Sequence, residues 1–106
     1  MSHANFTDIP ALSETGSTVS TTRQTLHRVV VTNLDATDVV YLKVFTTVAA
    51  PTYASDTPAF AIDVPPGAHS LDIGILCPAI HLQASSVRTA SAAAPAATLS
   101  VLVIRG

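Results

Sequence analysis

The sequence predicts an all-β fold, an antiparallel β-sandwich or a small barrel, and three observations lead to it. From residue 26 onward, short segments rich in Val, Ile and Thr recur, and Pro, Gly, Asn and Asp separate them. Within these segments apolar and polar residues alternate, which places one apolar face on each strand. No stretch of about 10–12 residues has the 3.6-residue apolar period of a helix.

The turn signals divide the chain into six expected strands. Asn and Asp side chains follow the first expected strand and favour a turn. The first and second expected strands should therefore form a hairpin. Pro65-Pro66-Gly67 ends the third strand, because proline lacks the N–H that a β-ladder needs. The strands are expected at residues 26–33, 39–47, 59–64, 69–75, 80–87 and 98–105.

Alternation also predicts the core and its opposite face. Asp72 and His81 lie opposite apolar neighbours and are expected to face solvent. The strands at 39–47 and 98–105 are apolar on both faces, so each is either central in a sandwich or covered by another subunit. The expected core residues are Val40, Leu42, Val44, Phe60, Ile62, Val64, Leu71, Ile73, Ile75, Ile80, Leu82, Ala84, Leu99, Val101 and Val103.

Residues 1–24 are polar and rich in Ser and Thr, and they are expected to form an extended N-terminal arm, with one possible strand near residues 18–22. Phe6, Ile9 and Leu12 are three residues apart, as in one helical turn or in anchors that dock on a neighbour. A mobile tail is the alternative, since chain termini are often disordered. The expected division is an arm at 1–24 and a β-sandwich domain at 25–106.

Charged residues make up 11% of the chain and hydrophobic residues 48%, whereas a typical globular domain has about 25% charged residues. Much of the surface must therefore consist of Ser, Thr, Ala and apolar atoms. Burial of part of this surface in an oligomer or a larger assembly is the favoured interpretation. A monomer with a Ser- and Thr-rich surface is the alternative.

Several function classes are disfavoured by composition. Lys43 is the single lysine, the four arginines are scattered, and Trp is absent. Nucleic-acid binding, which relies on basic clusters that neutralise phosphates and on aromatic residues that stack on bases, is therefore not expected. No apolar stretch reaches the roughly 20 residues that span a bilayer. Residues 1–10 lack the basic start and apolar run of a signal peptide, so synthesis in the cytoplasm without a membrane role is expected.

No catalytic, cofactor-binding or metal-ligating residue is predicted. His69, Asp72, Cys77 and His81 are close in sequence, but their spacing matches no standard zinc pattern. Cys77 and His81 lack a third group that would orient a nucleophile and its base. Cys77, the single cysteine, is expected to be a buried, inert thiol.

Five short motifs resemble a group of small virion proteins of tailed bacteriophages, over about residues 28–67. They are Val29-Val30-Val31-Thr32-Asn33, Val40-Tyr41-Leu42-Lys43-Val44-Phe45, Ala50-Pro51-Thr52, Asp56-Thr57-Pro58 and Pro65-Pro66-Gly67. The resemblance implies a β-sandwich, often jelly-roll-like, that is built into the virion. Related roles include capsid decoration (cement) proteins and parts of the neck, tail or spike base. The final loop is rich in Ala where the relatives carry Gly, Asp and Thr, which leaves the subgroup open.

The expected function is therefore that of a capsid decoration protein, which stabilises the phage head by bridging capsid subunits and catalyses nothing. The resemblance implies the major capsid protein or other virion proteins as partners and a homo-oligomer, with a trimer favoured. A glycan-binding β-sandwich is the alternative, although few aromatic residues are present to bind sugars. The expected assembly contacts are Phe6, Ile9, Leu12, Tyr41, Phe45, Leu102 and Ile104.

Overall fold

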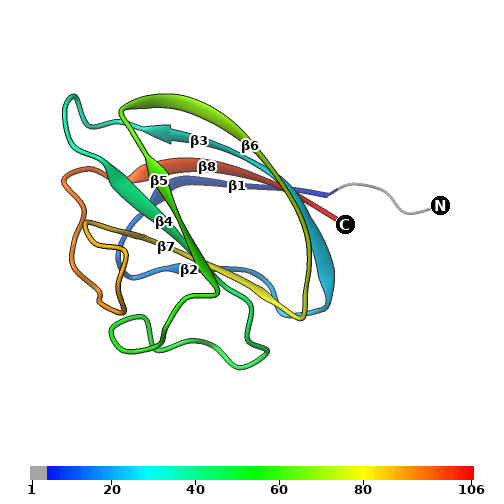
Figure 1. Ribbon diagram of the computed structural model, residues 1–106. Helices are drawn as coiled ribbons and strands as arrows, with labels where there is room; N and C mark the ends of the chain where they lie inside the picture. Colours follow the sequence, from blue (N-terminus) through cyan, green and yellow to red (C-terminus); the bar gives the residue numbers. More distant parts are fainter. Residues whose placement is uncertain (1–4) are drawn as a thin grey trace.

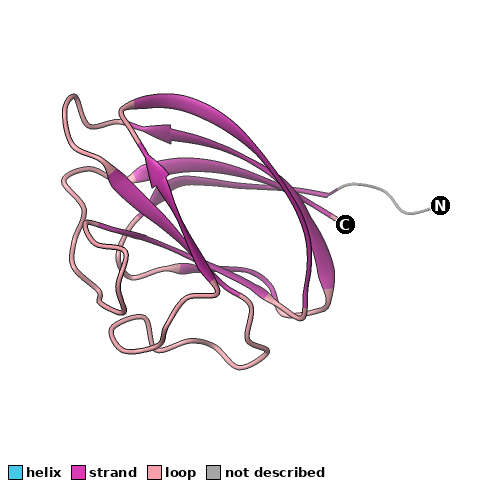
Figure 2. Ribbon diagram, in the orientation of Figure 1, coloured by secondary structure: helices cyan, strands magenta, loops and turns pink. Residues whose placement is uncertain are grey.

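The computed structural model describes residues 5–106, which form two packed β-sheets without a helix (Figures 1 and 2). The strands are β1 (Asn5–Leu12), β2 (Ser17–Ser20), β3 (Gln24–Asn33), β4 (Val40–Phe45), β5 (Phe60–Val64), β6 (Gly67–Cys77), β7 (Ile80–Ser85) and β8 (Leu99–Arg105). The predicted all-β class is confirmed, and the six expected strands correspond to β3 through β8.

The strand order identifies the sandwich as a jelly roll. One four-stranded sheet, called sheet A here, has the order β1-β8-β3-β6, and the other, sheet B, has the order β2-β7-β4-β5. Every pairing is antiparallel. Consecutive strands mostly alternate between the sheets, as in the two interleaved Greek keys of a jelly roll.

The predicted hairpin between the first two expected strands is wrong. β3 belongs to sheet A and β4 to sheet B, so the turn-forming residues between them carry the chain from one sheet to the other. Buried Asn33 fixes this corner, because its Nδ2 donates to the carbonyl oxygens of Asp38 and Val64, each at 2.8 Å. Turn chemistry bends the chain in both arrangements, but it does not select the partner strand.

The predicted N-terminal arm is corrected by the position of β1 and β2. β1 pairs with β8 at one edge of sheet A, and β2 pairs with β7 at one edge of sheet B. An edge strand contacts the sheet on one side only, so a polar, Ser- and Thr-rich segment can occupy it. Residues 1–4 of the expected arm lie outside the described residues.

The core lies between the sheets and contains the residues that alternation predicts on the central strands. The largest departures are on β5 and β6, where Phe60, Ile62, Leu71 and Ile73 are only partly buried and Ile75 is 43% exposed. β5 and β6 are edge strands, so their inward-facing side chains are covered on one side only. The buried apolar set is Leu12, Leu26, Val29, Val31, Val40, Leu42, Val44, Val64, Cys77, Ile80, Leu82, Ala84, Leu99, Val101 and Val103.

Candidate assembly surfaces

The outer face of sheet B is covered by two loops of the same chain, at residues 46–59 and 86–98. β7 turns His81, Gln83 and Ser85 toward these loops, and all three are buried. His81 Nε2 donates to the Thr47 carbonyl at 3.0 Å, and Ser85 Oγ donates to the Ala93 carbonyl at 3.1 Å. The sequence-based expectation that His81 faces solvent is therefore wrong, because loops distant in sequence cover it.

Lys43 lies in the same covered layer and is fully buried. Its Nζ donates to the carbonyl oxygens of Thr89 at 2.5 Å and Ser91 at 2.9 Å. No carboxylate in the described part of the chain forms an ion pair with it. Burial without a counter-ion lowers the pKa of Lys43 below its usual value, because desolvation disfavours the ammonium form.

Gln83 neighbours Lys43 across the strand pair and ties the same loop to the sheet. Its Nε2 donates to the carbonyl oxygens of Glu14 at 2.9 Å and Ser91 at 3.3 Å. Within residues 5–106, its Oε1 is the buried side-chain oxygen or nitrogen that has no hydrogen-bond partner. The layer thus consists mainly of polar strand residues that satisfy loop carbonyls.

Aromatic residues complete the cover on either side of Lys43. Phe45 is 2% exposed and packs edge-to-face on Tyr53 of the 46–59 loop, with the ring centroids 5.2 Å apart. Tyr41 is half-buried beneath the guanidinium of Arg88, 5.9 Å from the ring centroid. Both aromatic side chains therefore have partners within this chain.

The 46–59 loop also forms an open cavity of about 370 Å³. Its polar groups are already used in part, because Asp56 Oδ2 accepts from the Thr52 amide at 2.8 Å and Thr47 Oγ1 donates to the Ala49 carbonyl at 2.9 Å. The cavity is lined by Phe45, Thr46, Thr47, Asp56, Thr57 and Ala59.

The outer face of sheet A has a different character, since apolar side chains are exposed on it. Phe6 of β1, Ile104 of β8 and Arg28 of β3 lie in one row across the sheet, and Arg28 forms an ion pair with Asp72 of β6 at 2.7 Å. The next row contains Asp8, Leu102, Val30 and Ser70. Phe6 is 65% exposed, and Val30, Leu102 and Ile104 are partly exposed. We call Phe6, Val30, Leu102 and Ile104 the sheet A stripe.

The predicted contact residues therefore separate into three groups. Phe6, Leu102 and Ile104 lie together on the sheet A stripe. Ile9 packs partly against the core, and Leu12 belongs to the core, so neither is a free anchor. Phe45 and Tyr41 lie on the covered face of sheet B. Sequence reasoning missed Val30, whose place in the stripe depends on the strand register.

The residues considered for metal binding or nucleophilic chemistry are not brought together. Cys77 is buried in the core, where desolvation raises the pKa of its thiol, while His81 lies on the opposite side of its sheet in the covered layer. His69 Nε2 donates to the Pro65 carbonyl at 2.9 Å, and Asp72 pairs with Arg28. Within residues 5–106 no group of three or more His, Cys, Asp and Glu side chains is arranged to hold a metal ion.

Comparison with known proteins does not assign a function to these surfaces. No protein family, curated protein or solved structure matches the chain. Residues 5–106 contain no helix that is long and apolar enough to cross a membrane.

Proposed function

We propose that this protein is a structural, non-catalytic subunit of a phage virion, most specifically a capsid decoration protein that docks on the major capsid protein and stabilises the head. The sheet A stripe is the observation that carries the proposal. Exposed apolar side chains that lie together on a sheet face are typical of surfaces that another protein covers. The jelly-roll sandwich and the motif resemblance over residues 28–67 support the same role.

The size of this face favours a protein that binds as an oligomer. The four strands of sheet A have 8, 7, 10 and 11 residues. At a spacing of about 4.8 Å and a rise of about 3.3 Å per residue, they present on the order of 600 Å² in projection. A stable interface covers about 800 Å² on each partner, so a single copy would bind a shell weakly. Copies joined to one another bind a repeating lattice with a large gain in avidity. We therefore propose a homo-oligomer, and a trimer as its form.

Co-sedimentation with shells assembled from the major capsid protein of the same virus tests this role. Phe6→Asp places a charge on the most exposed residue of the stripe and is expected to weaken binding at least tenfold. Val48→Asp is the matched control, because Val48 is 68% exposed, much like Phe6, but lies in the loop that covers sheet B. Equal binding by both variants, or no binding by the unmodified protein, contradicts the proposal. Co-sedimentation with tails instead of shells would assign the protein to the neck, tail or spike base.

The cavity of the 46–59 loop favours a second candidate, a glycan-binding module. Its threonine hydroxyls and the Asp56 carboxylate match the hydroxyl groups of a sugar, and its volume lies within the range of small-ligand sites. An NMR titration with a panel of monosaccharides is expected to shift the amides of Thr46 and Thr57 under this function. Thr57→Val, which removes a hydroxyl and keeps the side-chain shape, should abolish those shifts. Unchanged spectra exclude the candidate.

A further inference from the structure

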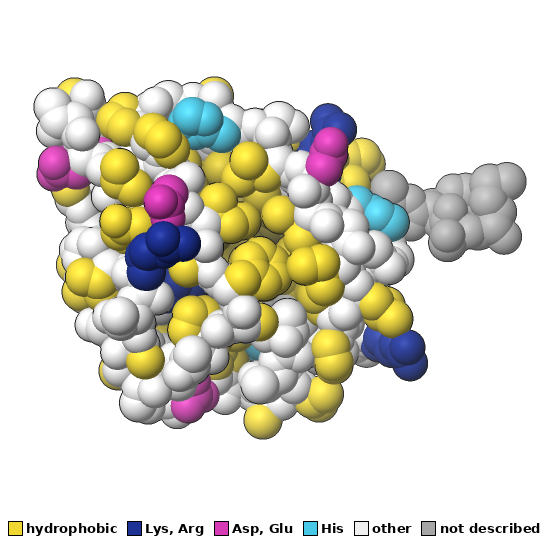
Figure 3. Space-filling model, in the orientation of Figure 1, with side chains coloured by type: hydrophobic (Ala, Val, Ile, Leu, Met, Phe, Trp, Pro, Cys, Tyr) yellow, Lys and Arg dark blue, Asp and Glu magenta, His cyan; other side chains and the backbone are white. Residues whose placement is uncertain are grey.

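One side of the sandwich is open, between the edge strands β5 and β6. β5 ends sheet B and β6 ends sheet A, and in Figure 3 apolar side chains fill the opening between them. The opposite side is closed by the turn that joins β1 to β2. The Ser13 carbonyl of this turn accepts a hydrogen bond from the Ala84 amide at 3.1 Å. We call the apolar set at the opening the open side; it consists of Phe60, Ile62, Leu71, Ile73 and Ile75.

The backbone of the open side is also available for contact. Among the described residues, 5–106, β5 pairs only with β4 and β6 only with β3, so each has one edge without a strand neighbour there. Such edges pair readily with another extended chain unless something blocks them. Gly74, with φ of 69°, stands where the register between β6 and β3 shifts, so the distortion is confined to one half of β6. The half from Gly67 to Asp72 keeps a regular register.

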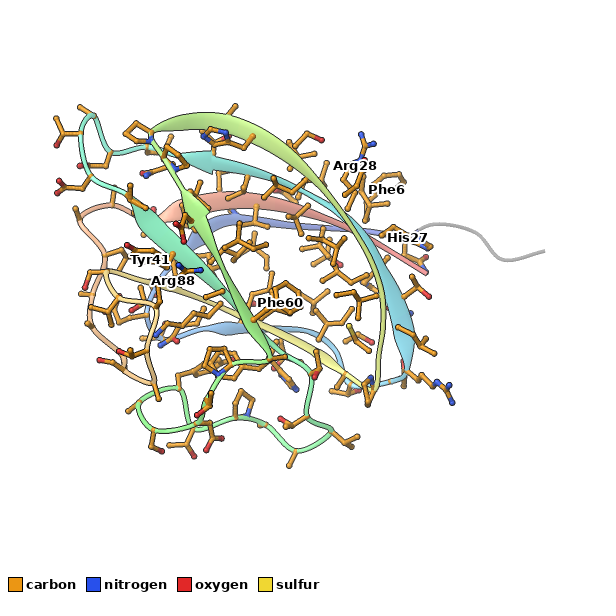
Figure 4. The ribbon with its side chains drawn as sticks, in the orientation of Figure 1. Phe6, His27, Arg28, Tyr41, Phe60 and Arg88 are labelled. Atoms are coloured by element: carbon orange, nitrogen blue, oxygen red, sulfur yellow. The ribbon has the colours of Figure 1, made fainter. Side chains whose placement is uncertain are left out.

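The charges beside the opening indicate which partner fits. On β5, Asp63 pairs with Arg88 at 3.4 Å, and on β6, Asp72 pairs with Arg28 at 2.7 Å. Figure 4 places Arg88 and Arg28 on opposite sides of Phe60, and Figure 3 shows a pair of opposite charges on each flank of the apolar opening. Each flank therefore carries both signs and no net charge. A strongly acidic or basic partner gains nothing from such a surface, whereas a second copy meets an Asp for each Arg.

We propose that the open side is the interface through which copies of this chain bind one another. Contact would bury the partly exposed apolar residues of β5 and β6, and it would set the Arg–Asp pair of one flank against that of the next copy. This interface deepens the proposed homo-oligomer, and its apolar residues on β5 and β6 are distinct from the sheet A stripe, although Arg28 and Asp72 border both surfaces. Self-association and shell binding can therefore fail separately.

Sedimentation velocity of the full-length chain over a wide concentration range tests the interface. We expect the unmodified protein to form an oligomer whose mass is an integral multiple of the chain mass. Ile75→Glu introduces a charge at the open side, at a position that is 43% exposed, and should raise the dissociation constant at least tenfold. Leu34→Glu is the matched control, since Leu34 is 63% exposed in the β3–β4 connection, and it should leave the mass unchanged.

A second variant separates the interface from folding. Asp63→Lys leaves two cations on one flank without touching the core, so it should weaken the oligomer while circular dichroism and the melting temperature stay close to those of the unmodified protein. Phe6→Asp should keep the oligomer even if it abolishes shell binding. A monomer at every concentration, or an oligomer that survives both Ile75→Glu and Asp63→Lys, overturns the proposed interface. Dissociation by Phe6→Asp in place of those two variants assigns self-association to sheet A.

Discussion

The two sheets of this sandwich have outer faces of opposite kind. On sheet B, polar side chains such as His81 and Gln83 are buried, whereas on sheet A apolar side chains such as Phe6 and Leu102 are exposed to different degrees. The difference teaches that burial on an outer face depends on what covers the face, and not on the polarity of the strand residues alone.

The loops that cover sheet B explain why polar side chains are buried on its outer face. Loop backbone brings carbonyl groups that need donors when they are buried. Lys43, Gln83 and Ser85 supply those donors to the carbonyls of the 86–98 loop. The sheet A stripe has no comparable set of donors, so it suits an apolar protein surface better than a loop.

The largest expected effect comes from comparing one phenylalanine on each outer face. Phe45→Ala should lower the free energy of unfolding by about 3–5 kcal/mol, because it empties a buried site beneath Tyr53. Phe6→Ala should change it by less than about 0.5 kcal/mol, as expected of an exposed position. Urea unfolding of the two variants checks both values. Similar losses of unfolding free energy in both variants would mean that Phe6 is as well buried as Phe45, and that the two outer faces are covered alike.

Two glycines sharpen the comparison at the backbone. Gly16 and Gly74 both have positive φ, at 76° and 69°, but a Cβ at Gly16 would overlap the ring of Tyr53, whereas a Cβ at Gly74 meets nothing within 4 Å. Gly74→Ala should lower the free energy of unfolding by about 1–2 kcal/mol, because alanine is strained in the left-handed conformation. Gly16→Ala should cost more, because Tyr53 must also leave its place over Phe45. Thermal unfolding of both variants measures the difference in stability. Equal losses of stability would show that the Tyr53 ring moves aside without an energetic cost.

Among the variants at buried positions or at glycines, the smallest effect at neutral pH is expected for Lys43→Met. The lost hydrogen bonds to the 86–98 loop should roughly offset the relieved desolvation, so the free energy of unfolding should change by about 1 kcal/mol or less.

The same variant should show a clear pH dependence. The folded state lowers the pKa of Lys43 below its usual 10.5, so the unfolded chain binds more protons between those two values. The contribution of Lys43 to stability therefore rises with pH in that window. The stability of the unmodified protein relative to Lys43→Met should increase as the pH approaches 10.5, measured by urea unfolding at a series of alkaline pH values. A constant difference would show that Lys43 reaches solvent.

Local pattern was sufficient for β3 to β8 and for most of the core, but it missed β1 and indicated β2 only as a possible strand. The alternation in residues 39–47 predicted the inward set Val40, Leu42 and Val44, because period two is a property of the strand itself. It did not predict that β3 and β4 lie in different sheets, since a turn signal does not choose a partner.

The surfaces were predicted less completely, because they depend on segments far apart in sequence. His81 and Lys43 are buried by loops whose positions no strand pattern encodes. Phe6, Leu102 and Ile104 were identified as apolar residues outside the core, and the register of β1, β8 and β3 places them side by side. Leu12 and Phe45 were misassigned, since an apolar residue gives the same signal in a core as at an interface.

The position of β8 between β1 and β3 has a consequence for synthesis. Among residues 5–106, β1 pairs with β8 alone and β2 with β7 alone, so these two strands meet their partners only after most of the domain has been made. Such long sequence separations slow folding and leave unpaired edges exposed in the nascent chain. Sheet B can therefore be completed once β7 has been made, whereas sheet A waits for β8.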